Sequence, residues 1–117
     1  MVVTSLQRFR ALGRMKAGTM NKTEQSYAED VLDLALARGD IRWYKFEAIK
    51  LRLADGTFYE PDFLVLTDKS LLECHEVKGA YLAEMSLVKP RVAASMFPFR
   101  FVLAQKVRKG EWKIEEV

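Results

Sequence analysis

The segment that follows Thr19 carries apolar residues at helical spacing. In "NKTEQSYAEDVLDLALARGD" they occupy positions i, i+4, i+7 and i+8: Tyr27, Val31, Leu34 and Ala35. This stripe predicts an amphipathic helix from about residue 22 to 38. Asn21 suits the N-cap position, Glu24 would then be the third helical residue of a capping box, and Gly39 suits the C-terminal cap.

From Ile41 onward the pattern changes to one that is typical of strands. "IRWYKFEAIKLRLA" is rich in aromatic and branched residues with partial alternation, and the Asp55-Gly56 pair that follows it is a hairpin turn signal. "TFYEPDFLVL" then predicts the partner strand, and "LLECHEVKG" predicts a third antiparallel strand after a turn at "TDKS". We expect the aromatic side chains of the first two strands to fill the core: Trp43, Tyr44, Phe46, Phe58 and Phe63.

The last third of the chain predicts a second helix and two more strands. "EMSLVKPRVAASMF" has helical composition and contains Pro90, and proline is tolerated in a first helical turn but costly in a helix interior. We therefore expect this helix to start near residues 86–89 and to end before Pro98. "FRFVLAQKV" and "EWKIEEV" predict strands on either side of a Lys109-Gly110 turn. The order αβββαβ, with a terminal strand, predicts an α+β or α/β domain with a mixed central sheet flanked by helices.

Length and composition limit the chain to a single domain. It has 117 residues and a mass of 13.5 kDa, and 50% of the residues are hydrophobic and 30% charged, as in ordinary globular proteins. No apolar run approaches the roughly 18 residues that span a bilayer, and the start lacks the apolar core of a secretory signal. The Arg-rich composition of the first residues is also compatible with a transit peptide. The single cysteine, Cys74, fits a reducing compartment and, with one histidine in the chain, does not complete a zinc site. We expect a cytoplasmic protein with no membrane partner.

Positive charge is concentrated at the N-terminus. The net charge is +3, but residues 1–20 hold four basic side chains and no acidic one, whereas the rest of the chain is almost neutral. A basic arm over residues 1–19 would attract a polyanion such as DNA to the domain at residues 20–117, and a disordered, solvated terminus is the alternative. The candidate DNA-contacting residues of the arm are Arg8, Arg10, Arg14 and Lys16.

Two predicted strands carry charges on faces that are otherwise apolar. In the third strand Glu76 and Lys78 fall on the same face as Cys74, and Asp62 falls on the apolar side of its strand directly after a proline. Burying unpaired charge is costly, and a divalent cation would remove that cost. Mg²⁺ prefers oxygen ligands, which here would be the carboxylates of Asp62 and Glu76 and the carbonyl of Val77. Lys78 would position or activate the attacking water.

The segments "PD" at residues 61–62 and "EVK" at residues 76–78 resemble the motif of the PD-(D/E)XK nuclease superfamily. The predicted αβββαβ order is also similar to the restriction-endonuclease-like core of that superfamily. Four segments between residues 20 and 104 resemble, more closely, a small phage and prophage family similar to phage Holliday-junction resolvases: "MNKTEQSYAEDV", "WYKFEAIKLRLADGTFYEPDFLVL", "HEVKGAY" and "FPFRFV". The stretch "AYLAEMSL" and Pro90 depart from the acidic, aromatic segment and uninterrupted helix that the resemblance leads us to expect.

The resemblance implies a metal-dependent DNA endonuclease that uses Mg²⁺ or Mn²⁺ and acts as a homodimer on branched duplex DNA such as Holliday junctions. It also implies a phage or prophage protein working in a bacterial host cell. In that superfamily a glutamate on the first helix often joins the metal cluster, and Glu24 is the match here. The implied catalytic residues are Glu24, Asp62, Glu76 and Lys78, and the implied metal ligands are Asp62, Glu76 and Val77. Beyond the motif, Lys89 and Arg91 would either contact DNA phosphates or remain solvated.

Each of these assignments has an alternative. A nicking or sequence-specific nuclease, or a noncatalytic DNA-binding protein of the same fold, would fit the same segments. Glu24 serves equally well as a capping residue, and Glu76 and Lys78 would also make a plain ion pair. The pattern acid-x-lysine recurs at residues 111–113, but only the first occurrence lies on an apolar strand that follows a Pro-Asp pair.

Overall fold

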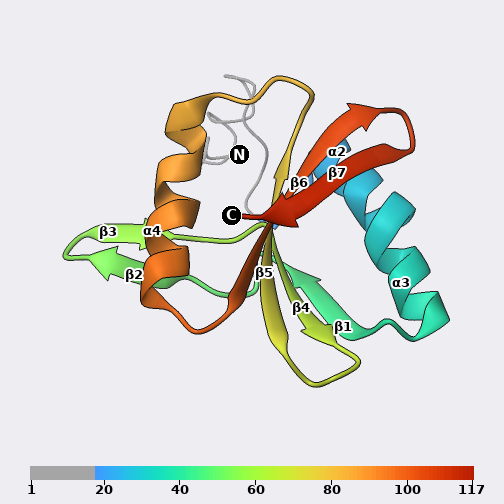
Figure 1. The fold of residues 1–117 in the computed structure, drawn as a ribbon, viewed down its shortest axis with the longest axis horizontal. Helices are drawn as coiled ribbons and strands as arrows, with labels where there is room; N and C mark the ends of the chain where they lie inside the picture. The colour runs from blue at the N-terminus through green and yellow to red at the C-terminus, as the bar shows by residue number, and fades with distance from the viewer. Residues whose placement is uncertain (1–17) are drawn as a thin grey trace, which may run out of the picture.

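A five-stranded mixed sheet with helices on both faces forms the centre of the protein (Figure 1). The computed structural model describes residues 18–117, and no helix among them is long and apolar enough to cross a membrane. Across the sheet the strands are β1 (Ile41–Phe46), β4 (Phe63–Thr67), β5 (Leu72–Lys78), β6 (Arg100–Arg108) and β7 (Glu111–Glu116). A separate two-stranded sheet consists of β2 (Leu51–Ala54) and β3 (Thr57–Tyr59). The α+β class and the mixed sheet that the sequence predicts are confirmed.

The first helix runs without a break from residue 22 to 38. It consists of α2 (Lys22–Tyr27), a π-helical segment η1 (Ala28–Leu32) and α3 (Asp33–Arg38). The side chains of Asn21 and Glu24 each accept a hydrogen bond from the backbone N–H of the other, so the predicted capping box is confirmed. Gly39 ends the helix with a φ of 82°, a left-handed conformation that glycine adopts without steric cost. The apolar spacing did not indicate the π-helical segment.

The hairpin predicted from "IRWYKFEAIKLRLA" and "TFYEPDFLVL" is broken in the middle. β1 pairs with β4 and β2 pairs with β3, with residues 47–50 and 60–62 between them. Pro61 has no N–H to donate to a ladder. Opposite it, Glu47 adopts a left-handed conformation with a φ of 48°. Asp62 therefore lies just before β4 and not inside a strand, which corrects the sequence-based prediction.

Helix α4 (Val88–Met96), preceded by the 3₁₀ turn η2 (Glu84–Leu87), connects the parallel strands β5 and β6. A parallel pair needs such a crossover because its two strands run in the same direction. Pro90 is the third residue of α4, a position whose N–H has no acceptor within the helix. The predicted start and end of this helix are confirmed, and the proline does not interrupt it.

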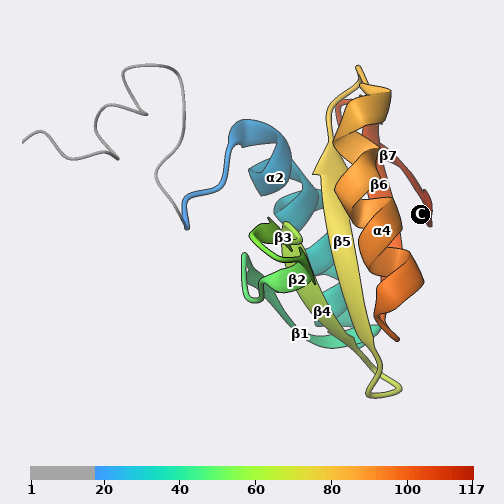
Figure 2. The same ribbon diagram turned by 90° about the vertical axis from the view of Figure 1, so that its left-hand side faces the viewer.

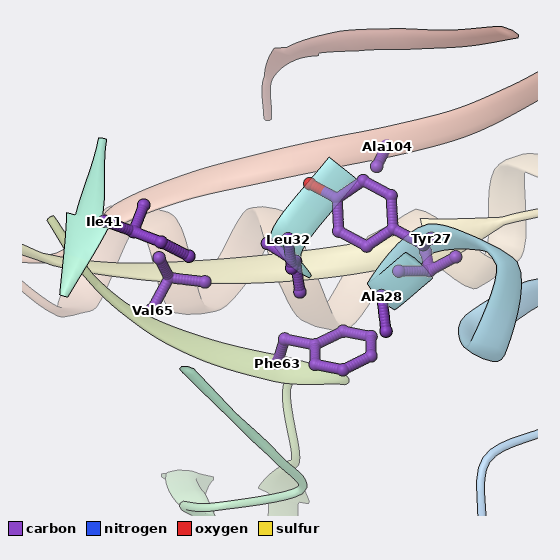
Figure 3. Packing of buried hydrophobic residues seen from close by; sticks show 8 residues of the cluster. Tyr27, Ala28, Leu32, Ile41, Phe63, Val65 and Ala104 are labelled. Atoms are coloured by element: carbon purple, nitrogen blue, oxygen red, sulfur yellow. The ribbon is translucent and has the colours of Figure 1, made fainter. Parts of the chain in front are cut away.

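The sheet separates two hydrophobic clusters. On one face Tyr27 of the first helix packs with Phe63 and Val65 of β4 (Figure 3). On the other face Cys74 of β5 and Ala93 of α4 belong to a second cluster, to which the β2-β3 hairpin also contributes. Figure 2 shows α2 and α4 on opposite sides of the sheet, with the hairpin beside β5. The charged face of β5 therefore lies under α4 and the hairpin.

Only part of the predicted aromatic core is buried. Phe63 is completely buried, and Tyr44 and Phe46 pack against its cluster. Trp43 and Phe58 are 41% and 39% exposed, so their assignment to the core is wrong. Strand alternation explains both, because each is adjacent to an aromatic residue that takes the inward position.

Candidate active site

Asp62 lies at the point where the ladder between β4 and β5 ends. The last paired residues of that ladder are Phe63 and His75, so the backbone of Val77 extends past β4. The N–H of Val77 donates a hydrogen bond of 2.8 Å to Oδ2 of Asp62. The carbonyl oxygen of Asp62 in turn accepts a bond of 2.8 Å from the N–H of Glu47. Asp62 is therefore fixed through both its side chain and its main chain.

Glu76 and Lys78 lie on the same face of β5, as the alternation predicts, and they contact each other. Glu76 is 8% exposed, and its Oε2 lies 3.0 Å from Nζ of Lys78. Its Oε1 accepts a hydrogen bond of 2.6 Å from the hydroxyl of Tyr59, the last residue of β3. Both oxygens of this buried carboxylate are thus held, one by β5 itself and one by the β2-β3 hairpin.

Tyr59 is a site residue that sequence reasoning missed. Burial, followed by the negative charge of Glu76, raises the pKa of Tyr59 well above its usual range, so the hydroxyl stays a hydrogen-bond donor. The signal in the sequence was weak: Tyr59 alternates with the exposed Phe58 and comes three residues before Asp62. Its contact with Glu76 depends on how the hairpin packs over the sheet, which local patterning does not reveal.

The carboxyl group of Asp62 has a strongly shifted pKa. Burial is the largest cause of a rise from 3.8 to about 8, and the charge of Glu76 and the neighbouring carboxyl of Glu24 raise the pKa of Asp62 further. The N–H of Val77 acts in the opposite direction. The carboxyl groups of Glu24 and Glu76 thus both act on Asp62, and Glu76 is in turn paired with the ammonium group of Lys78.

Glu24 has two contacts that make its two predicted roles compatible. Its Oε1 accepts a hydrogen bond of 2.9 Å from the N–H of Asn21, which confirms the capping role. The same carboxyl group lies close enough to Asp62 to raise the pKa of that residue. The start of the first helix therefore lies near the charged end of β5.

The donor set fits a hard divalent cation. Asp62 and Glu76 offer carboxylate oxygens, and the carbonyl of Val77 faces the same side of β5 as its N–H, toward Asp62. These are the oxygen ligands that Mg²⁺ and Mn²⁺ take in proteins. Within residues 18–117, no group of three or more His, Cys, Asp or Glu side chains could hold a metal ion by itself. The predicted ligand set is not a group of this kind, because it consists of two carboxylates, from Asp62 and Glu76, and the main-chain carbonyl of Val77.

An open cavity of about 520 Å³ borders this cluster. Glu76 and Lys78 line it, between the β2-β3 hairpin and the η2-α4 segment, whereas Asp62 is not one of its lining residues. Lys89 of α4 lines the same cavity, so this predicted phosphate contact lies near the motif. Arg91 does not line it, and its guanidinium lies 3.0 Å from a carboxylate oxygen of Glu84 on the exposed surface. The candidate residues of the basic arm lie outside the described residues: Arg8, Arg10, Arg14 and Lys16.

Cys74 and His75 lie on opposite faces of β5 and do not form a joint site. Cys74 is 1% exposed in the cluster beneath α4, and burial raises the pKa of its thiol to about 12. Nδ1 of His75 lies 2.7 Å from the hydroxyl of Tyr27 on the other face of the sheet. The prediction that Cys74 is a core residue is confirmed.

Comparison with protein-family models, curated proteins and solved structures finds no match to this chain. The resemblance to PD-(D/E)XK nucleases therefore depends on the motif residues quoted above. The function has to be argued from the geometry and chemistry of the site.

Proposed function

We propose that the protein is a Mg²⁺- or Mn²⁺-dependent DNA endonuclease of the PD-(D/E)XK type. The observation that carries this proposal is the convergence of Asp62, Glu76 and Lys78 at one end of β5. The carboxyl of Asp62 accepts a hydrogen bond from the backbone of Val77, and the preceding residue, Glu76, pairs with Lys78. A plain structural ion pair would explain Glu76 and Lys78, but it would not explain why the buried carboxyl of Asp62 lies close enough for Glu76 and Glu24 to raise its pKa.

The residues have distinct roles in phosphodiester hydrolysis. Asp62, Glu76 and the carbonyl of Val77 would hold the cation, which when bound supplies a Lewis acid for the phosphate and lowers the pKa of a water. Lys78 borders the cavity, where its ammonium group would orient the attacking water and offset the negative charge that develops on the phosphate. Glu24 would add negative charge beside Asp62 from the start of the first helix.

The favoured substrate is branched duplex DNA such as a Holliday junction. The resemblance to phage resolvases supports this choice, as does the concentration of basic residues in the arm. Cutting two symmetric strands requires two active sites, so the proposal includes a homodimer. It also includes a phage or prophage origin and action in the bacterial cytoplasm, which the single cysteine fits.

The test is cleavage of labelled four-way junctions and linear duplexes by the purified protein with Mg²⁺ or Mn²⁺. Asp62→Ala and Lys78→Ala should each lower the cleavage rate by at least about a hundredfold, since each removes a group that acts on the transition state. Lys113→Ala is the matched control, because Glu111 and Lys113 form the other acid-x-lysine pattern, on the exposed edge strand β7. Wild-type rates in both site variants would refute the proposed active site.

The same experiment separates the alternatives. Equal cutting of junctions and plain duplex would favour a nicking or sequence-specific nuclease. DNA binding without any metal-dependent cleavage would favour a noncatalytic binding protein. Stabilisation of the wild-type protein by Mg²⁺ in a thermal melt, lost in Asp62→Ala, would test the cation site independently of cleavage.

A further inference from the structure

The cavity beside Glu76 has an exposed aromatic residue in its wall. Phe58 of β3 lines this cavity and is 39% exposed. It belongs to neither hydrophobic cluster, because Tyr59, the next residue, takes the inward position and reaches Glu76. The fold therefore does not need an aromatic ring at position 58 for its core.

Two lysines accompany Phe58 around the cavity. Nζ of Lys50 lies 5.1 Å from the centre of the Phe58 ring, and Lys89 lines the cavity from α4. In the part of the chain that the structure describes, Lys78 is paired with Glu76, whereas neither Lys50 nor Lys89 takes part in an ion pair. The exposed ring thus has one lysine over it and a second lysine in the wall of the same cavity, which the carboxylates of Glu60 and Glu76 also line.

An aromatic ring flanked by cations is the chemistry that binds a nucleotide. A nucleobase stacks on the ring whatever its identity, and the lysines neutralise the phosphates on either side. A volume of about 520 Å³ lies in the range of cavities that hold small ligands. Within a duplex both faces of each base are already stacked on neighbours, so only an unpaired nucleotide has a free face to offer.

We infer that Phe58, Lys50 and Lys89 form a subsite that stacks an unpaired nucleobase next to the phosphate that Glu76 and Lys78 act on. This inference rests on the proposed function, and it assigns to the β2-β3 hairpin the choice of branched over linear DNA. A branch point supplies unpaired or readily unstacked bases, and a continuous duplex does not. Figure 1 shows the β2-β3 hairpin beside α4, away from the first helix.

The test measures binding without cleavage, in an Asp62→Asn background that keeps the DNA intact. The probe is a DNA hairpin with a single-stranded tail that carries 2-aminopurine next to the duplex, since stacking on an aromatic ring quenches the fluorescence of this base. Phe58→Ala should abolish the quenching and weaken binding of the tailed hairpin about tenfold, a typical contribution of one stacked base. Binding of the fully paired hairpin should change less than about twofold. Phe58→Tyr should retain both the quenching and the affinity.

Trp43→Ala is the matched control, because Trp43 is equally exposed but lies outside the cavity. It should leave quenching and affinity unchanged. Phe58→Leu keeps apolar bulk without an aromatic face, so it should behave like Phe58→Ala if stacking is responsible. Full quenching and wild-type affinity in both Phe58→Ala and Phe58→Leu would overturn the inference.

The outcome for this subsite is distinguishable from the outcome for the nuclease. If wild-type protein cleaves DNA but the Phe58 variants bind the tailed hairpin normally, the subsite is wrong and the active site stands. If no metal supports cleavage but the Phe58 variants lose quenching, the subsite stands in a noncatalytic DNA-binding protein. Lys50→Gln and Lys89→Gln should each weaken binding of the tailed hairpin more than Lys69→Gln, a lysine in the exposed turn after β4.

Discussion

The N–H of Val77 donates a 2.8 Å hydrogen bond to the carboxylate of Asp62, at a position where β5 has no strand partner on that side. Here the carboxylate of Asp62 accepts the hydrogen bond that a backbone carbonyl of a neighbouring strand would otherwise accept. The break in the long hairpin makes this possible, because β4 starts only after Asp62. The irregularity of the first hairpin and the candidate active site are therefore one structural feature.

The crowded carboxyl of Asp62 should make the metal-free protein less stable as the pH rises. Its pKa is about 8 in the folded protein and near 3.8 when exposed, so between these values the folded state holds a proton that the unfolded state has released. Folding stability therefore falls as pH rises from about 4 to about 8 and levels off above that. Asp62→Asn removes this effect and should raise the free energy of unfolding by about 1–3 kcal/mol at pH 9, and by much less at pH 5. Urea unfolding with EDTA at both pH values measures it.

Asp68→Asn is the control for this stability prediction, since Asp68 is an exposed aspartate in the turn after β4. It should change stability by less than about 0.5 kcal/mol at either pH. If Asp62→Asn is equally or less stable than wild type at pH 9, the carboxyl groups of Glu24 and Glu76 do not act on Asp62 as described.

The hydroxyl of Tyr59 should matter for both activity and stability. Tyr59→Phe keeps the buried ring but removes the donor to Oε1 of Glu76, so the buried carboxylate loses one of the two contacts that orient it. We expect cleavage to fall about tenfold and the free energy of unfolding to fall by about 1–3 kcal/mol, because a buried acceptor is left without a donor. Tyr44→Phe is the matched control, because it removes a hydroxyl that bonds Asp33 far from the site. Equal rates for Tyr59→Phe and Tyr44→Phe would remove Tyr59 from the active site.

Much of the fold was predictable because its signals are local. Asn21, Glu24 and Gly39 define the ends of the first helix through capping contacts within a few residues. The break in the hairpin was not predictable in the same way. It depends on Pro61 and on the left-handed Glu47, which lie in the two opposite gaps between the strands and become neighbours only when the hairpin forms.

The candidate site was predictable only where it follows strand alternation. Glu76 and Lys78 share a face of β5 because they are two residues apart. The contact of Glu76 with Tyr59 joins two different sheets. Periodicity does not determine how one sheet packs against another, so this partner could not be derived from the pattern.

The hydrogen bond between Tyr27 and His75 should be important for stability. In the neutral form of His75, Nε2 donates to the carboxylate of Glu73, which can only accept, and Nδ1 then accepts from the hydroxyl of Tyr27. Tyr27→Phe would leave Nδ1 buried without a donor, and we expect a loss of about 1–3 kcal/mol in the free energy of unfolding. Chemical denaturation gives the free energy of unfolding of Tyr27→Phe and of Tyr44→Phe. The first variant loses a buried hydrogen bond, and the second loses an exposed one. Equal stability of the two variants would show that the Tyr27 bond contributes no more than a surface contact.

The basic arm should increase the salt dependence of DNA binding. Replacing its four basic residues with glutamine removes up to four phosphate contacts, so the slope of log Kobs against log salt should become shallower by up to about 3.6. A second variant that neutralises four basic residues on the body of the domain removes the same net charge: Lys69, Arg108, Lys109 and Lys113. Fluorescence anisotropy with one duplex at several salt concentrations gives both slopes. A shallower slope in the arm variant alone would show that the arm contacts DNA. An equal change in both variants would mean that net charge accounts for the attraction, and the arm would then be a solvated terminus.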